Sequence, residues 1–237
     1  MRRTRGCRRI GAVRTGIDAG LMERHVVASF GYPFRPGGRL ARWLVGVLLV
    51  ALLPITCPVV FGYAVSCLRT GACAGSAPPP RWGISARLLS DGLWSALQAI
   101  VLTAPFVLLA WLLGRVAVGL MHPTGDAFLD PALGWILAVT VAALPWGMVL
   151  LIVLPPTLAS FAVTGRAADL ADPRLVVACV RERYADWNLV LVAITTSWAL
   201  AVVGLALLGV GIVPGAWYAI LVSSHACSAL SPNRAAR

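Results

Sequence analysis

Residues 53–65 read LPITCPVVFGYAV and residues 154–163 read LPPTLASFAV, so two long apolar runs break at prolines and then continue with an aromatic-Ala-Val step. Aligning Pro58 with Pro156 brings Tyr63 opposite Phe161. An even number of the membrane crossings predicted below separates the two copies, so a duplication would give parallel rather than inverted repeats. A chance match between apolar segments is the alternative, and the sequence leaves both open.

The composition indicates a protein of the lipid bilayer. Of its 237 residues, 59% are hydrophobic and only 12% are charged, and the mean hydropathy is +0.84. Soluble domains contain about twice this share of charged residues. We therefore expect an all-α integral membrane protein that crosses the cell membrane several times.

Five segments are long and apolar enough to cross a bilayer, which takes about twenty residues of α-helix. The first three are residues 42–67, 92–120 and 132–163. The last apolar stretch, residues 187–230, is about twice the length that one crossing needs. It must therefore turn, and residues 209–215, GVGIVPG, supply glycine and proline for a reversal. The fourth and fifth spans would form a helical hairpin.

Two linkers between the spans mix charged residues with apolar residues at intervals of three and four. They are residues 81–93 and 172–187. This periodicity favours two short amphipathic helices on the membrane surface, although solvated loops are the simpler alternative. Two spans separate the linkers, so both must lie at the same face of the membrane.

The termini differ from the rest of the chain. The net charge is +11, there is no lysine, and many arginines precede the first span. Residues 1–26 are predicted to be a disordered basic tail, with Met22 as an alternative start, because they carry many like charges and few apolar side chains. Residues 27–231 are predicted to be the membrane domain, and residues 232–237 a C-terminal tail. A basic segment beside an apolar run favours interaction with anionic lipid, and no nucleic-acid partner is expected.

Several short motifs occur in a specific order and spacing. They are SFGYPFRPGG at residues 29–38, PRW at 80–82, LLSDGLWSAL at 88–97 and GVGIVPGAWYAIL at 209–221. Together with the two proline segments they resemble the DUF4013 family, a group of small prokaryotic membrane proteins of unknown function, over about residues 27–232. The resemblance implies a polytopic helical protein and supplies no activity.

The motifs and the proline segments single out residues expected to hold structural junctions. These are Tyr32, Pro33, Gly62, Tyr63, Trp82, Asp91, Gly92 and Pro156. At the start of the second span, Gly92 would allow a bend, Trp82 would anchor at the lipid headgroups, and Asp91 would cap the helix.

No pattern of catalytic, cofactor-binding or metal-binding residues is recognisable. The centres of the predicted spans contain no Asp, Glu or Arg, and His225 is interpreted as interfacial. His122, Asp126 and Asp130 form a compact group, but the neighbouring proline and glycine favour a turn. We therefore expect a protein that is not an enzyme and has no cofactor.

Two functional classes remain. The first is a membrane scaffold or accessory protein that acts through helix packing and surface helices, with lipids, other membrane proteins or a second copy as partners. The alternative is a channel or facilitator without a titrating site inside the membrane. The lack of charge in the spans favours the first.

Overall fold

The computed structural model describes residues 18–35, 40–73, 77–121, 131–206 and 211–231, and the regular elements in these ranges are all helical. The all-α fold predicted from composition is therefore confirmed. The elements are α1 (Asp18–Phe30), η1 (Tyr32–Phe34), α2 (Leu40–Ala51), α3 (Leu53–Cys73), α4 (Ala86–Met121), α5 (Pro131–Thr164), η2 (Ala167–Ala171), α6 (Pro173–Glu182), α7 (Tyr184–Ala206), α8 (Ile212–Cys227) and η3 (Ser228–Leu230).

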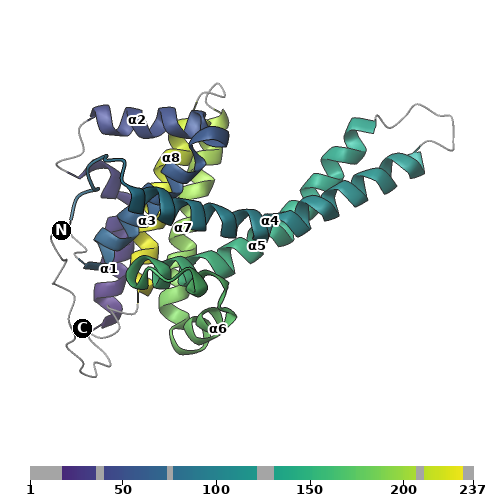
Figure 1. Cartoon of the computed structure of the whole chain (residues 1–237). Coiled ribbons are helices and arrows are strands. Elements are labelled where there is room, and N and C mark those ends of the chain that lie inside the picture. The colour runs from purple at the N-terminus through teal and green to yellow at the C-terminus, as the bar shows by residue number, and fades with distance from the viewer. Residues whose placement is uncertain (1–17, 36–39, 74–76, 122–130, 207–210, 232–237) are drawn as a thin grey trace. The chain divides into compact units, whose positions relative to one another are not determined.

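The helices form two compact units. The core unit comprises Met1–Ala96 and Pro155–Arg237, and the hairpin unit comprises Leu97–Leu154. The hairpin unit consists of the later part of α4 and the earlier part of α5 (Figure 1).

The core unit is organised around α7 and α8, which pack against each other (Figure 1). Helices α1, α2 and α3 also contact α8. Aromatic and aliphatic side chains from η1, α3 and α8 form its buried centre: Tyr32, Val60, Tyr63, Cys67, Trp217 and Leu221. Small residues allow the close approach of α7 and α8, since a Cβ at Gly215 would lie only 2.8 Å from the Cα of Ala201.

Four described helices are long and apolar enough to cross a membrane: α3, α4, α5 and α7. The hairpin predicted for residues 187–230 is present as α7 and α8, and residues 207–210 at its turn lie outside the described part of the chain. Helix α8 has only 16 residues, which is shorter than a full crossing requires. The described residues thus contain four candidate spans, one fewer than the five that the sequence predicts.

The predicted first span, residues 42–67, is wrong as a single helix. It consists of α2 and the first part of α3, which are separated at Leu52. Pro54 causes the break because it has no N–H to bond the carbonyl of Val50. At the break, the hydroxyl of Thr56 donates to the carbonyls of Leu49 and Leu52. The first proline segment therefore begins a helix, whereas the second lies near the end of α5, so the two copies do not occupy equivalent places.

Helix α5 ends where its sequence provides a stop. Gly165 has φ +71°, a left-handed conformation that favours glycine, and its N–H donates to the carbonyl of Phe161 at 2.8 Å. The hydroxyls of Ser160 and Thr164 both donate to Asp169, each at 2.7 Å, and so fix the following turn.

Only one of the two predicted surface helices is a separate element. Helix α6 begins at Pro173 and buries no residue, and Asp172 caps it by accepting the N–H of Arg174. The other linker, residues 81–93, does not form its own helix. Its second half is the start of α4, which continues for 36 residues without interruption.

Contacts between the helix ends bring the two linkers to the same end of the core unit, and their common face of a membrane stays a prediction. These contacts are those of Arg69 with Asp91 and the carbonyl of Ala162, of Gly71 with Ser228, and of Arg183 with the carbonyl of Leu230.

The prediction that residues 1–26 are disordered is wrong for residues 18–26, which belong to α1, while residues 1–17 lie outside the described part of the chain. Most of the positive charge that predicts disorder lies in residues 1–17. Met22 and Val26 are buried where α1 packs against α7 and α8, and the charged Glu23 and Arg24 remain exposed.

Candidate functional site

Gly62 and Gly92 mark a close crossing of α3 and α4 within the core unit. A Cβ at Gly92 would lie 1.7 Å from the carbonyl oxygen of Pro58, and one at Gly62 would lie 2.1 Å from that of Leu88. Neither position has room for a side chain. Gly92 lies inside the continuous α4, so the bend expected there is wrong, and glycine is needed for the contact between two backbones.

Tyr63 and Trp82 hold the segment before α4 against α3. Their rings stack with centroids 3.9 Å apart, and the hydroxyl of Tyr63 donates to the carbonyl of Pro80 at 2.9 Å. The cap of α4 is Ser85, whose hydroxyl accepts the N–H of Leu88, and not Asp91 as expected.

The other three predicted junction residues are buried at different places. Tyr32 and Pro33 lie in η1, where Tyr32 joins the aromatic centre of the core unit and burial raises the pKa of its hydroxyl above the usual range. Pro156 is buried in the C-terminal part of α5. The structure thus brings together Gly62, Tyr63, Trp82, Asp91 and Gly92.

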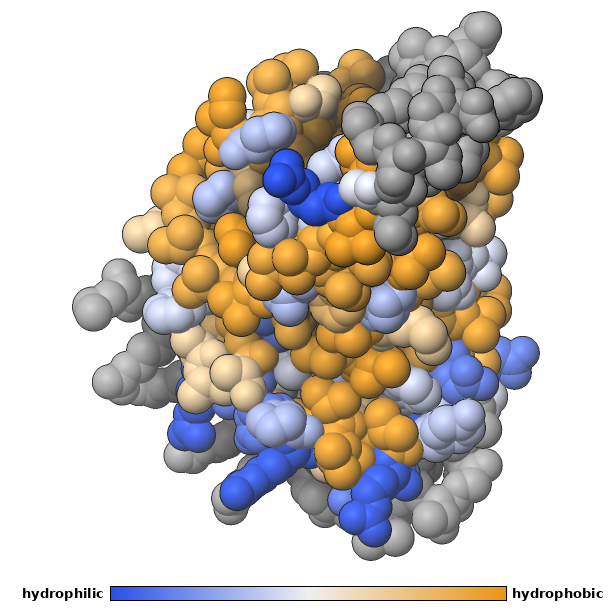
Figure 2. All heavy atoms as spheres, turned by 90° about the vertical axis from the view of Figure 1, so that its right-hand side faces the viewer, coloured by the Kyte–Doolittle hydropathy of each residue, from blue (hydrophilic) through white to orange (hydrophobic). Residues whose placement is uncertain are grey.

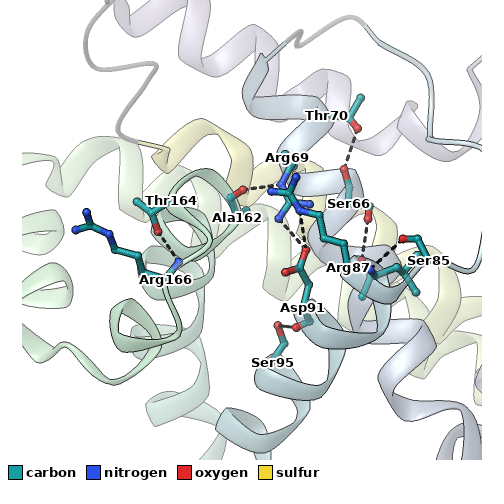
Figure 3. A network of polar contacts seen from close by, with 12 residues as sticks. Ser66, Arg69, Thr70, Ser85, Arg87, Asp91, Ser95, Ala162, Thr164 and Arg166 are labelled. Atoms are coloured by element: carbon teal, nitrogen blue, oxygen red, sulfur yellow. Dashed lines mark hydrogen bonds and ion pairs between the residues drawn. The ribbon is translucent and has the colours of Figure 1, made fainter. Parts of the chain in front are cut away.

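A network of charged and polar groups lies beside this crossing (Figure 3). The guanidinium of Arg69 on α3 donates to the carboxylate of Asp91 on α4 at 2.8 Å and to the carbonyl of Ala162 on α5 at 2.7 Å. Arg87, one turn before Asp91 on α4, also approaches that carboxylate at 3.8 Å. One side chain therefore joins three helices of the core unit.

Burial differs across the network. The side chain of Asp91 is 10% exposed and that of Arg69 is 23% exposed, whereas that of Arg87 is 62% exposed. Withdrawing Asp91 from water is costly, and the charge of Arg69 together with its hydrogen bond offsets that cost.

A pocket of about 170 Å³ opens next to the network. Its walls come from α3, the segment before α4 and the first turn of α4, and its polar lining includes Tyr63, Ser66, Arg69, Arg81, Ser85 and Arg87.

A second polar cluster is buried in the core unit, between α1 and α8. The imidazole of His225 lies between the rings of His25 and Tyr32, with centroid distances of 4.4 and 4.3 Å. His25 is 8% exposed, and His225, Ser29 and Ser228 are fully buried. We call these four residues the histidine cluster.

Hydrogen bonds connect the members of the histidine cluster. Nε2 of His25 lies 3.2 Å from the carbonyl oxygen of His225, and a carbonyl only accepts, so Nε2 carries a proton. The hydroxyl of Ser29 donates to the carbonyl of His25 and lies 2.8 Å from Nδ1 of His225, with which it forms a hydrogen bond. The cluster thereby ties α1 to the end of α8.

Comparison with known protein families shows to which family the chain belongs. The model of a family described as a protein of unknown function, DUF4013, matches residues 45–221, which is well over half of the chain. The chain belongs to the DUF4013 family. No curated protein and no solved structure matches it.

The two polar clusters relate differently to the family match in this DUF4013 protein. Arg69, Asp91 and the two crossing glycines all lie within residues 45–221. His25, His225 and Ser228 lie outside them. The crossing and its charged network thus belong to the part of the chain that defines the family.

Sequence reasoning missed the main partners in both clusters. His225 was expected at the membrane interface but is enclosed by protein, and its partner His25 lies 200 residues away in a segment expected to be disordered. The ion pair of Arg69 with Asp91 had one available signal, since opposite charges stood near the facing ends of two neighbouring apolar runs.

The described residues contain no group of three or more His, Cys, Asp or Glu side chains that could hold a metal ion. The compact group of His122, Asp126 and Asp130 lies outside the described residues.

Proposed function

We propose that this DUF4013 protein is a membrane scaffold or accessory protein without enzymatic activity, and that it contacts other membrane proteins through the apolar surface of the hairpin unit. One observation carries the proposal, namely the exposure of α4 and α5. In their most apolar stretches only 6% and 11% of the residues are buried. Figure 2 shows apolar residues covering most of the face that it presents.

The hairpin unit is suited to present such a surface because its two helices are fastened to each other. The indole of Trp146 on α5 donates to the hydroxyl of Thr103 on α4 at 3.1 Å. Gly114 on α4 accommodates the ring of Trp135, since a Cβ there would lie 2.3 Å from that ring. The two helices thus contact each other through a glycine and a hydrogen bond. Large aliphatic side chains such as Leu108 and Leu137 are exposed and face outward.

Both lipid and protein can cover an apolar helix surface, and photo-crosslinking distinguishes the two. A photo-crosslinking amino acid is placed at Leu108 in the hairpin unit, which is 57% exposed, and as a matched control at Val202 on α7, which is 61% exposed. Irradiation in native membranes should give discrete protein adducts from Leu108 and only lipid adducts from Val202. The adduct partner should also co-purify with the unmodified protein.

Two outcomes would contradict the proposal. Equal protein adducts from both positions would show that the hairpin unit is no special contact surface. Solute or ion flux through vesicles that contain only the purified protein, above the leak of protein-free vesicles, would support the channel or facilitator class instead.

A further inference from the structure

We propose that the pocket beside the crossing of α3 and α4 binds a phosphate group. The pocket encloses about 170 Å³, roughly the volume of five or six water molecules at about 30 Å³ each. This is enough for a phosphate group and too little for a drug-sized ligand. The proposal is independent of any partner of the hairpin unit.

The charges around the pocket favour an anion. Three arginines line it, Arg69, Arg81 and Arg87, and the carboxylate of Asp91 is the acidic partner of Arg69 and Arg87. Three positive charges against one negative charge leave an excess of positive charge at the pocket. Arg81 is exposed and makes no hydrogen bond or ion pair within the described part of the chain, so it can turn toward a ligand.

The guanidinium of Arg69 has donors to spare. Its bonds to Ala162 and Asp91 use two of the five N–H groups of an arginine side chain. These two bonds also fix the orientation of the planar group, so its other N–H groups are held in place beside the pocket. Phosphate oxygens are the acceptors that such a fixed guanidinium binds well.

The first turn of α4 adds neutral donors to the same pocket. Ser85 and Arg87, which line it, flank the first residue of α4. The N–H of Leu88 is bonded to the hydroxyl of Ser85, whereas the N–H groups of Ala86 and Arg87 have no acceptor within the helix and lie at the positive end of the helix dipole. An anion at this place would therefore meet backbone donors as well as the arginines.

The location suits a phosphate that belongs to a lipid. The pocket lies between the C-terminal part of α3 and the N-terminus of α4, and both helices are candidate membrane spans. The ends of spans lie at the level of the lipid headgroups, so the phosphate of an anionic phospholipid can reach the pocket from the bilayer. A soluble phosphate ion offers the same chemistry, and the experiment separates the two sources.

The test uses the purified full-length protein in detergent. Retention of added phosphatidylglycerol is measured by native mass spectrometry, and binding of inorganic phosphate is measured by calorimetry. The variant R81Q/R87Q removes two exposed arginines from the pocket. The matched control R115Q/R166Q removes two exposed arginines outside it, with the same change of net charge. Melting curves of both variants confirm that they remain folded.

We expect R81Q/R87Q to bind at least about tenfold more weakly than the unchanged protein, which corresponds to the loss of one or two charged hydrogen bonds. The control should bind like the unchanged protein. Loss in the phosphatidylglycerol arm alone would identify lipid as the source, and loss in both arms would show a general phosphate site. Equal binding by the two variants, or no binding of either probe to the unchanged protein, would overturn the proposal.

Discussion

In the core unit, 33% of the residues in the most apolar stretch of α3 and 28% of those in α7 are buried, whereas in α4 and α5 the shares are 6% and 11%. All four helices are apolar enough to cross a membrane, and α4 and α5 are the more apolar pair. Apolar character alone therefore does not decide whether a helix faces protein or its surroundings.

The two units differ in what lies between their helices. In the core unit, glycines allow backbones to touch, as Gly62 and Gly92 do, and polar groups such as Arg69 and His225 find partners on other helices. In the hairpin unit, the indole of Trp146 on α5 donates to the hydroxyl of Thr103 on α4. Burial of apolar side chains does not drive helices together in lipid, because lipid is as apolar as the side chains. Close packing and polar contacts hold the helices together instead.

The largest effect is expected from Gly92→Ala. The added methyl group meets the backbone of α3, which cannot move aside like a flexible side chain, so we expect a loss of stability of about 3 kcal/mol or a failure to fold. Gly147→Ala in the hairpin unit is the matched control, because nothing lies within 4 Å of its added Cβ. It should be neutral or stabilise the helix by up to about 1 kcal/mol. Thermal unfolding in detergent measures the stability of both variants. Equal stability of the two variants would contradict the difference in helix packing between the two units.

A smaller effect is expected from Ser29→Ala in the histidine cluster. The change removes the hydrogen-bond partner of the buried Nδ1 of His225, which costs about 1–3 kcal/mol. Thr140→Val is the control, since the hydroxyl of Thr140 is exposed and bonds only the carbonyl of Ile136 on its own helix. Its effect should stay within about 0.5 kcal/mol. If Ser29→Ala had the same melting temperature as the unchanged protein, the hydrogen bond between Ser29 and His225 would not stabilise the core unit.

The smallest effect is expected from Trp146→Phe, which removes the hydrogen bond to Thr103 but retains an aromatic ring. The loss should be about 1 kcal/mol and should concern the hairpin unit. Hydrogen exchange measured by mass spectrometry should become faster in α4 and α5 within residues 97–154 and remain unchanged in α7 and α8. Faster exchange throughout the chain would show that the two units unfold as one.

The local sequence was sufficient to predict most helices of this protein. Long apolar runs gave α4, α5 and the hairpin of α7 with α8, because a helix in lipid needs only enough consecutive apolar residues to satisfy its own backbone. The amphipathic α6 followed from its periodicity. The break between α2 and α3, which the prediction missed, also has a local cause, since Pro54 is visible in the sequence.

The resemblance to the family pointed to Gly62, Tyr63, Trp82, Asp91 and Gly92, which the structure brings together, but it did not give their contacts. The expected bend at Gly92 is instead a crossing of two backbones, and the expected cap at Asp91 is instead an ion pair with Arg69. The reason is that these roles depend on which helix lies opposite, and a single sequence does not contain that information.

Only the tertiary structure decided that residues 18–26 are ordered and that His25 meets His225 across 200 residues. The charges of the N-terminal segment and its length predicted disorder, because by itself it has few apolar side chains to bury. Packed against α7 and α8 it buries Met22 and Val26 and gains partners for His25. The sequence determined which segments become helices, since that depends on neighbouring residues, whereas the order of the N-terminus and the polar clusters arose from contacts between distant parts of the chain.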